Sequence, residues 1–180
     1  NAVNFGAPFE SFAYYDGDVC DIAFTVDMNE YIGTRTPQVF VKDIRIASGD
    51  EDEIGISERN FKTLASGGSY KDAEKDIPGL AEFRNVFRYI RREAGHEGTI
   101  LSLTSARRTL EYEYDIPVSL TKLKIILEVL NEQKLISLQY RDRNAVVVTM
   151  TPSAGKINID ESPLLRTVRA STTKKVDNDA

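Results

Sequence analysis

The sequence predicts an α+β protein in which a small antiparallel sheet is followed by a winged-helix-like domain. Three observations predict this class. Apolar and polar residues alternate over 20–28, apolar residues recur at helical spacing in three segments between 80 and 130, and two β-rich runs follow at 136–140 and 145–150. We therefore divide the chain into a β region (1–46), a linker with a partly ordered middle (47–77), a winged-helix-like domain (78–169) and a disordered tail (170–180).

The β region rests on two predicted strands. Gly33 separates residues 20–28 from a second run at 38–46, and residues 3–5 offer a third strand. Two or three strands are a marginal unit, so we expect this sheet to belong to a larger one and the chain to be a piece of a longer protein, with Asn1 and Ala2 as candidate cloning residues. The side chains expected on the half-buried face of the first strand are those of Cys20, Ile22, Phe24, Val26 and Met28.

The linker changes composition twice. Residues 48–53, SGDEDE, predict an acidic loop, and residues 66–69, SGGS, predict a flexible connection. Between them, apolar residues favour a short helix docked on one of the flanking domains. These residues are Ile54, Ile56, Phe61 and Leu64.

The second domain begins with three predicted helices. The first spans 80–94 after Pro78 and ends at Gly95, a strand is expected at 99–103, and the second helix spans 104–114. Ser119 is placed to cap the third helix. The buried face of the first helix is predicted to hold Phe83, Val86, Phe87 and Ile90, and that of the third Leu120, Leu123, Leu127 and Leu130.

The runs at 136–140 and 145–150 predict a hairpin with a polar tip at 141–144. Three short helices, with a strand before the second and a hairpin after the third, follow the order of a winged helix-turn-helix. Beyond the hairpin we expect an edge strand at 156–159, a last helix at 162–169 and the disordered tail.

The composition limits which kinds of protein and partner the sequence is compatible with. No apolar run approaches the roughly 18 residues that span a bilayer, so we expect no membrane partner, and a single cysteine fits a reducing cytoplasm. The net charge of −5 is uneven. Residues 1–77 hold 7 basic and 15 acidic side chains, a net of −8, whereas residues 78–180 hold 16 and 13, a net of +3. The two parts therefore favour different electrostatic partners.

The residues that could carry catalysis are few. His96 lies in the loop GHEG without neighbouring ligands, which favours a solvated loop residue over a metal ligand. Cys20 sits on the apolar strand face, which favours a small core residue over a nucleophile. The run 50–53 lacks calcium-loop spacing and is typical of a solvated charge run. We expect neither a catalytic residue nor a metal site in this chain.

The first helix of the second domain carries the strongest polar pattern. At 100° per residue, Arg84, Arg88 and Arg91 fall in one narrow stripe with Arg92 beside it. Segregated arginines suit phosphate backbones or an acidic peptide, and a solvated helix face is the alternative. Four further arginines extend this candidate basic surface: Arg107, Arg108, Arg141 and Arg143.

The third helix argues against sequence-specific reading of duplex DNA. Apolar residues occupy more than half of its circumference. A recognition helix presents donors and few carboxylates to the major groove, so a winged-helix transcription regulator is disfavoured. The positions expected to remain exposed are mixed in charge: Thr121, Lys124, Glu128 and Glu132.

With these residues in hand, the chain resembles the C-terminal region of RecJ-type single-stranded-DNA exonucleases of the DHH family. Residues 21–45, DIAFTVDMNEYIGTRTPQVFVKDIR, look like the last hairpin of that family's OB-fold domain, and residues 1–6, NAVNFG, are similar to the preceding strand. The segment 160–165, DESPLL, looks like part of the extra C-terminal domain of longer members. The resemblance is specific over about the first 46 residues and looser beyond 77.

The resemblance implies a non-catalytic accessory region of an enzyme that removes nucleotides from 5′ to 3′ in DNA repair and recombination. The manganese or magnesium of that enzyme would belong to a nuclease core absent from this chain. Expected partners are single-stranded DNA, single-strand-binding protein and that core. An OB surface binds single strands with aromatic and basic residues, and near this hairpin only Tyr31, Arg35 and Lys42 suit that task. The alternative is a protein-protein or intramolecular docking module that does not contact nucleic acid.

Overall fold

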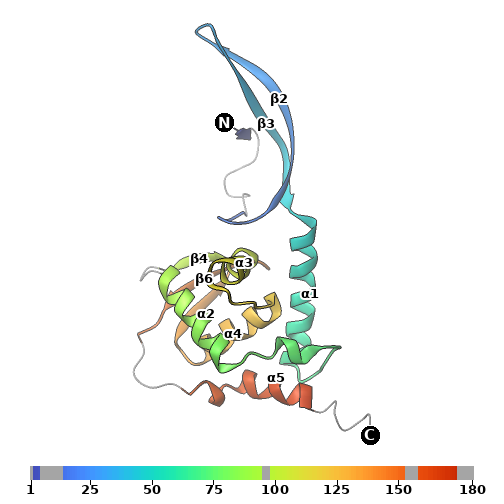
Figure 1. Cartoon of the computed structure of the whole chain (residues 1–180), viewed down its shortest axis with the longest axis vertical. Coiled ribbons are helices and arrows are strands. Elements are labelled where there is room, and N and C mark those ends of the chain that lie inside the picture. The colour runs from blue at the N-terminus through green and yellow to red at the C-terminus, as the bar shows by residue number, and fades with distance from the viewer. Residues whose placement is uncertain (1, 5–13, 95–97, 153–157, 174–180) are drawn as a thin grey trace.

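The chain is elongated, with a long β-hairpin projecting from a body of helices and a small sheet (Figure 1). The structure is a computed structural model that describes residues 2–4, 14–94, 98–152 and 158–173. The hairpin consists of β2 (Cys20–Tyr31) and β3 (Thr34–Ile46). β3 leads directly into α1 (Ser48–Ala65), which runs along one side of the body. The mixed α+β class predicted from the sequence is confirmed, with one sheet in the hairpin region and another in the body.

The hairpin turn has only two residues between paired strands. Tyr31 pairs with Thr34, and the intervening Ile32 and Gly33 both have positive φ, 49° and 74°. A two-residue turn with positive φ at both positions matches the right-handed twist of the strands, so Gly33 reverses the chain as predicted. The short strand β1 (Ala2–Asn4) pairs with β3 in parallel, which gives the order β1-β3-β2.

The apolar face of β2 is exposed, which corrects the prediction of a half-buried strand. Four side chains on this face expose between 47% and 61% of their surface. Their partners across the ladder are apolar too, so this face of the hairpin is hydrophobic over these four pairs, and the charged pair of Glu30 and Arg35 follows toward the tip. Alternation had indicated burial, but the described residues leave about half of each of these four side chains exposed. The four side chains are those of Ile22, Phe24, Val26 and Met28, and their partners in β3 are Ile44, Val41, Val39 and Pro37.

The acidic segment predicted as a loop is the first part of α1, so the linker prediction is wrong there. Asp50 and Glu51 lie in the first turn of this helix, where negative charge interacts favourably with the helix dipole. Ile54 and Leu64 are buried against the body, as expected for a docked segment. The helix is longer than predicted because its acidic half contacts basic side chains of the body. A short 3-10 helix, η2 (Ala73–Asp76), then leads to the body.

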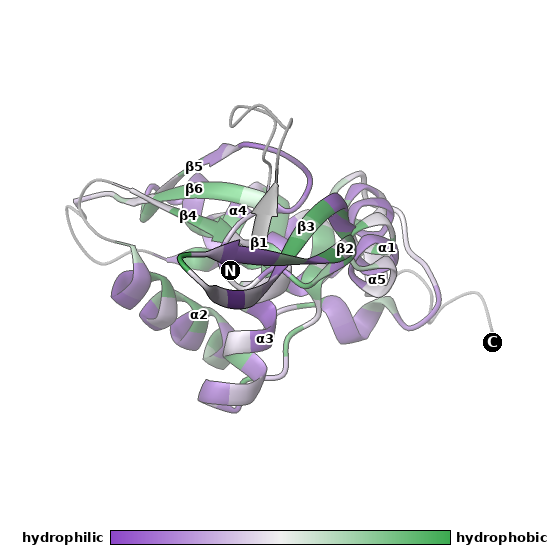
Figure 2. Cartoon of the chain, turned by 90° about the horizontal axis from the view of Figure 1, so that it is seen from above, coloured by the Kyte–Doolittle hydropathy of each residue, from purple (hydrophilic) through white to green (hydrophobic). Residues whose placement is uncertain are grey.

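The body contains each helix and strand predicted between residues 80 and 150, with boundaries shifted by no more than one residue at an end. They are α2 (Leu80–Glu93), β4 (Thr99–Ser102), α3 (Leu103–Tyr114), α4 (Leu120–Glu132), β5 (Ile136–Tyr140) and β6 (Ala145–Met150). The sheet has the order β4-β6-β5, and its central strand β6 is hydrophobic along most of its length (Figure 2). Ser119 caps α4 by accepting a hydrogen bond from the backbone N–H of Lys122, at 3.0 Å.

Helix α4 is surrounded by other elements. α1 and α5 (Pro163–Thr173) pack on it from one side and α2 and α3 from others. Thr121 and Lys124, which were predicted to be exposed, keep only 3% and 5% of their surface accessible. Amphipathicity could not reveal this burial, because α1 lies far away in the sequence.

The C-terminal segment also differs from the prediction. The 3-10 helix η3 (Ile159–Glu161) begins at the last residue of the predicted edge strand, whereas residues 156–157 lie outside the described residues. Helix α5 extends to Thr173 into the predicted disordered tail, and Ser171 is only 3% exposed. Residues 174–180 lie outside the described part. Within the described residues, no helix has the length and apolar content needed to cross a membrane.

Candidate nucleic-acid interface

The predicted arginine stripe lies on the outer side of α2. The opposite side of this helix buries Phe83, Val86 and Ile90 in the core, so its polar side must face solvent. Arg84, Arg88 and Arg91 are all exposed. Successive members of the stripe are about 4.5 to 6 Å apart along the axis, given the helical rise. Within the described residues, none of the three side chains forms a hydrogen bond or ion pair.

Arg92 lies beside the stripe but is held by neighbours. Its guanidinium carbon is 5.8 Å from the ring centre of Tyr114, a cation-π distance, and its Nε is 3.8 Å from a Glu93 carboxylate oxygen. Tyr114 in turn packs edge-on against Tyr89, with ring centres 5.7 Å apart. Burial, followed by the charge of Glu93, raises the pKa of Tyr89 to about 12. Arg92 therefore contacts α3 through Tyr114, whereas its three neighbours form no such contact with the described residues.

The two arginines of α3 are engaged inside the molecule. Arg108 Nη1 donates to both carboxylate oxygens of Asp50, at 2.9 and 2.8 Å, and its Nη2 donates to the carbonyl of Gly17, at 2.9 Å. Arg107 forms ion pairs with Glu53, at 2.9 Å, and Glu111, at 2.7 Å. The Nε–H of Arg107 is not aimed at the Glu53 oxygen, so that contact is an ion pair without a hydrogen bond.

The tip of the β5–β6 hairpin contributes two exposed arginines, of which Arg143 is paired with acidic residues of α1. Arg143 contacts Glu51 of α1 at 2.6 Å and Glu58 at 3.0 Å, and these hydrogen bonds raise the pKa of its guanidinium. Arg141 is exposed. The run 50–53 is thus not a solvated charge run, as predicted, because three of its four carboxylates pair with arginines of the body. Asp52 fits the prediction, and Glu51 remains exposed although it is paired.

The hairpin candidates are remote from α2. Tyr31 and Arg35 lie near the far tip of the hairpin, where Arg35 Nε donates to Glu30 at 2.9 Å (Figure 1). Lys42 is the extra residue of a β-bulge, because Ala23 pairs with Asp43 and Phe24 pairs with Val41. The structure therefore does not bring the predicted binding residues together in one site.

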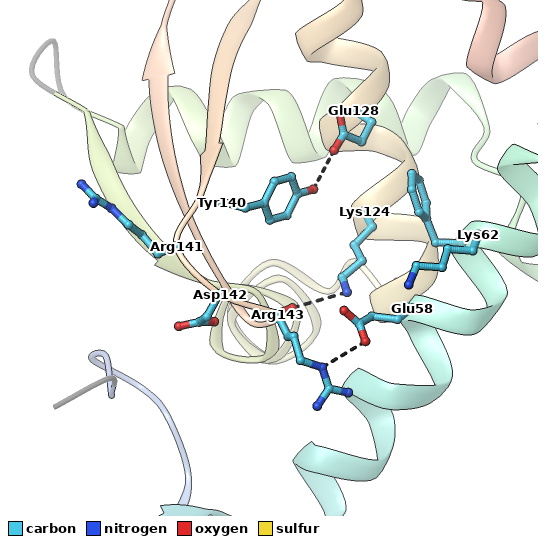
Figure 3. Close-up of a pocket in the computed structure, with 9 residues that line it drawn as sticks. Glu58, Lys62, Lys124, Glu128, Tyr140, Arg141, Asp142 and Arg143 are labelled. Carbon is cyan, nitrogen blue, oxygen red and sulfur yellow. Dashed lines mark hydrogen bonds and ion pairs between the residues drawn. The ribbon is translucent and has the colours of Figure 1, made fainter. Parts of the chain in front are cut away.

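A cavity that sequence reasoning missed lies between α1, α4 and the β5–β6 turn (Figure 3). Its volume is about 440 Å³. Lys124 lines it, although the sequence placed this residue on an exposed helix face. Among the described residues its Nζ forms one long hydrogen bond, 3.5 Å to the carbonyl oxygen of Arg143. Burial lowers the pKa of its ammonium group, and the nearby Glu58 carboxylate acts in the opposite direction. No signal in the sequence distinguishes Lys124 from a surface lysine.

The inventory of reactive groups within the described residues is small. Burial raises the pKa of the Cys20 thiol, with Asp18 and Asp50 acting in the same direction, so the thiol is held in its protonated, weakly nucleophilic form. His96 lies outside the described residues. In the part of the chain that the structure describes, no group of three or more His, Cys, Asp or Glu side chains could hold a metal ion.

Comparison with known proteins assigns no family. No protein-family model matches the chain, no curated protein matches it, and no solved structure matches its fold. The interpretation of the site therefore rests on the residues and geometry described above.

Proposed function

We propose that the chain is a non-catalytic accessory region of a RecJ-like 5′ to 3′ single-stranded-DNA exonuclease, and that α2 contributes to binding of single-stranded DNA. The observation that carries the proposal is the stripe of Arg84, Arg88 and Arg91, three exposed guanidinium groups without partners among the described residues. The sequence of the hairpin supports the choice of parent enzyme. The body would then be the winged-helix-like domain, and the hairpin a part of an OB-like sheet.

The position of α4 supports contact with single-stranded DNA or with a partner protein, and it argues against sequence-specific binding of duplex DNA. In a winged helix-turn-helix the helix equivalent to α4 enters the major groove. Here α1 and α5 pack against that helix, and Thr121 and Lys124 are buried. The exposed cations instead lie on α2, where they can contact phosphates of a flexible strand without penetrating a groove.

A triple replacement of the stripe tests this proposal. Arg84, Arg88 and Arg91 are changed together to alanine, and binding of a fluorescent oligo(dT) is followed by anisotropy over a range of salt concentrations. We expect affinity to fall about tenfold or more at low salt. The slope of log K against log salt should shrink by about 2, since each lost phosphate contact on a single strand removes about 0.7.

A second triple variant controls for the loss of net charge. Arg59, Lys71 and Lys75 are exposed and lie outside α2, so their replacement by alanine removes the same charge from other surfaces. We expect this control to retain most of the affinity. If both variants weaken binding equally, or if neither does, the stripe is not the DNA contact. A triple arginine-to-lysine variant should bind with nearly wild-type salt dependence, because the charges remain.

The exposed face of the hairpin favours a second candidate function, docking onto the nuclease core of the same polypeptide or onto another protein. Ile22, Phe24, Val26 and Met28 form a continuous hydrophobic strip next to apolar residues of β3. Large exposed apolar patches are typical of interaction surfaces. Association with the nuclease core in the absence of DNA would favour this candidate. Single-strand-binding protein is a further possible partner of the body under the same proposal.

A further inference from the structure

The cavity beside Lys124 is formed by three elements that are distant in the sequence. α1 supplies Glu58, Phe61 and Lys62, and α4 supplies Lys124 and Glu128. The end of β5 and the β5–β6 turn supply residues 140–143 (Figure 3). Its volume of about 440 Å³ lies within the range of small-molecule sites, roughly 300 to 1,000 Å³. Two aromatic rings, those of Phe61 and Tyr140, belong to its wall.

The acidic groups of the cavity are satisfied by the protein itself. Glu58 accepts a hydrogen bond from Arg143, and Glu128 accepts one from the hydroxyl of Tyr140 at 2.8 Å. Asp142 Oδ1 accepts two backbone hydrogen bonds, from the N–H groups of Asn144 and Ala145 at 2.7 and 2.8 Å. These carboxylates therefore hold the walls together, and each already has a donor.

The two lysines of the cavity have no such partners. Within the described residues, neither Lys62 nor Lys124 forms an ion pair. Lys124 exposes only 5% of its surface. Its ammonium group has three N–H donors, and among the described residues only one long hydrogen bond is formed. Glu58 favours the charged form of Lys124 but forms no ion pair with it, so the buried ammonium group is only partly compensated and the site favours an incoming anion. Lys62, at the exposed edge of the cavity, adds a second ammonium group.

We propose that this cavity binds a small phosphate monoester carried on an aromatic or heterocyclic body, of the size of a mononucleotide. The phosphate group would contact the ammonium groups of Lys124 and Lys62, and the flat body would lie against Phe61 and Tyr140. The stacking of a base on an aromatic side chain and the pairing of lysine with phosphate are both favourable and compatible with this volume. All residues of this site belong to α1 and the body, and none lies in the hairpin that resembles RecJ-type enzymes.

The test is titration of the full chain by isothermal calorimetry with three probes: thymidine 5′-monophosphate, thymidine and inorganic phosphate. We expect the monophosphate to bind about tenfold or more tightly than either thymidine or phosphate, because only this probe uses both halves of the cavity. In ¹⁵N-labelled protein, saturable shifts should concentrate on α4 and the β5–β6 turn. Equal binding of all three probes, or binding of none, overturns the proposal.

Two variants locate the site. Lys124→Met keeps the apolar stem while removing the charge, and we expect it to weaken monophosphate binding about tenfold or more. Lys62→Met lies at the exposed edge, where folding does not depend on it, and should weaken binding about threefold. Lys71→Met, exposed and outside the cavity, is the matched control and should leave binding unchanged. Undiminished affinity in both cavity variants, or an equal loss in the control, contradicts the assignment.

Discussion

Two groups of arginines in the body have the same chemistry and different surroundings. Arg84, Arg88 and Arg91 on α2 face solvent and make no ion pair with the described residues, whereas Arg107 and Arg108 on α3 are partly buried and paired with acidic residues. The difference comes from α1, whose acidic first half forms ion pairs with α3 and the β5–β6 turn and, among the described residues, none with α2. Exposed arginines remain available for a ligand, and paired arginines fasten the hairpin-bearing helix to the body.

This contrast explains why charge counts alone mislead. The acidic first part and the basic second part of the chain suggest separate surfaces with separate partners, yet much of the opposite charge is neutralised where α1 meets the body. Asp50, Glu51 and Glu53 contact the body from within about one turn of one helix. Among the cations that form no ion pair with the described residues, those grouped on α2 and in the cavity beside Lys124 are therefore candidates for external ligands.

Removal of a paired arginine should have the largest effect on stability. Arg108→Ala deletes the contacts to Asp50 and Gly17 and leaves the Asp50 carboxylate, whose side chain is 15% exposed, without its counterion. We expect the free energy of unfolding to fall by about 2 kcal/mol in urea titrations. Arg88→Ala, the matched exposed arginine, should change it by no more than about 0.5 kcal/mol. If the two variants lose the same free energy of unfolding, the paired and the exposed arginines do not differ in their contribution to stability.

Lys124 tests an intermediate case, a cation that is buried and unpaired. Its pKa is lowered from 10.5 by burial and by the nearby charges of Arg143 and Lys62, while Glu58 acts in the opposite direction. Below the folded-state pKa the ammonium group is charged in both states and its burial cost is fully present. Between that pKa and 10.5 the unfolded chain binds more protons, so this contribution to stability rises with pH.

Lys124→Met should therefore increase the free energy of unfolding at pH 7 by about 1 kcal/mol. The difference from the wild type should shrink as the pH approaches 10.5. The measurement is urea denaturation of both proteins at several pH values, and comparison between them cancels the tyrosine titrations that also occur at high pH. A variant that is less stable than the wild type at pH 7, with a difference independent of pH, would contradict an uncompensated buried charge.

The smallest effect on stability is expected at the exposed face of the hairpin. Phe24 is 54% exposed, so Phe24→Thr should change the free energy of unfolding by no more than about 0.5 kcal/mol. If this face docks onto a nuclease core, the same change should weaken their association, measured by co-elution in size-exclusion chromatography without DNA. Thr25→Ala, on the opposite face of β2, is the control. If Phe24→Thr associates with the core as tightly as the wild type, the exposed face of the hairpin is not the docking surface.

Much of the fold was accessible from the sequence, because its signals are local. Helical spacing in residues 80–132, the cap at Ser119 and the alternation in 136–150 depend on neighbouring residues, and each predicted element there is present. The helical character of residues 48–53 was not accessible. Gly49 and four consecutive acidic residues disfavour an isolated helix, and the arginines that stabilise it lie more than 50 residues away in the sequence.

The candidate site divides in the same way. The stripe of Arg84, Arg88 and Arg91 follows from helical periodicity, which is a property of one segment. Whether an arginine is free or paired, and whether Lys124 is exposed or lines a cavity, depends on how α1 packs against α3, α4 and the β5–β6 turn. The sequence by itself determined which elements form and which faces are polar. Only the tertiary structure decided which charges remain available, because electrostatic pairing and burial depend on groups brought together from distant parts of the chain.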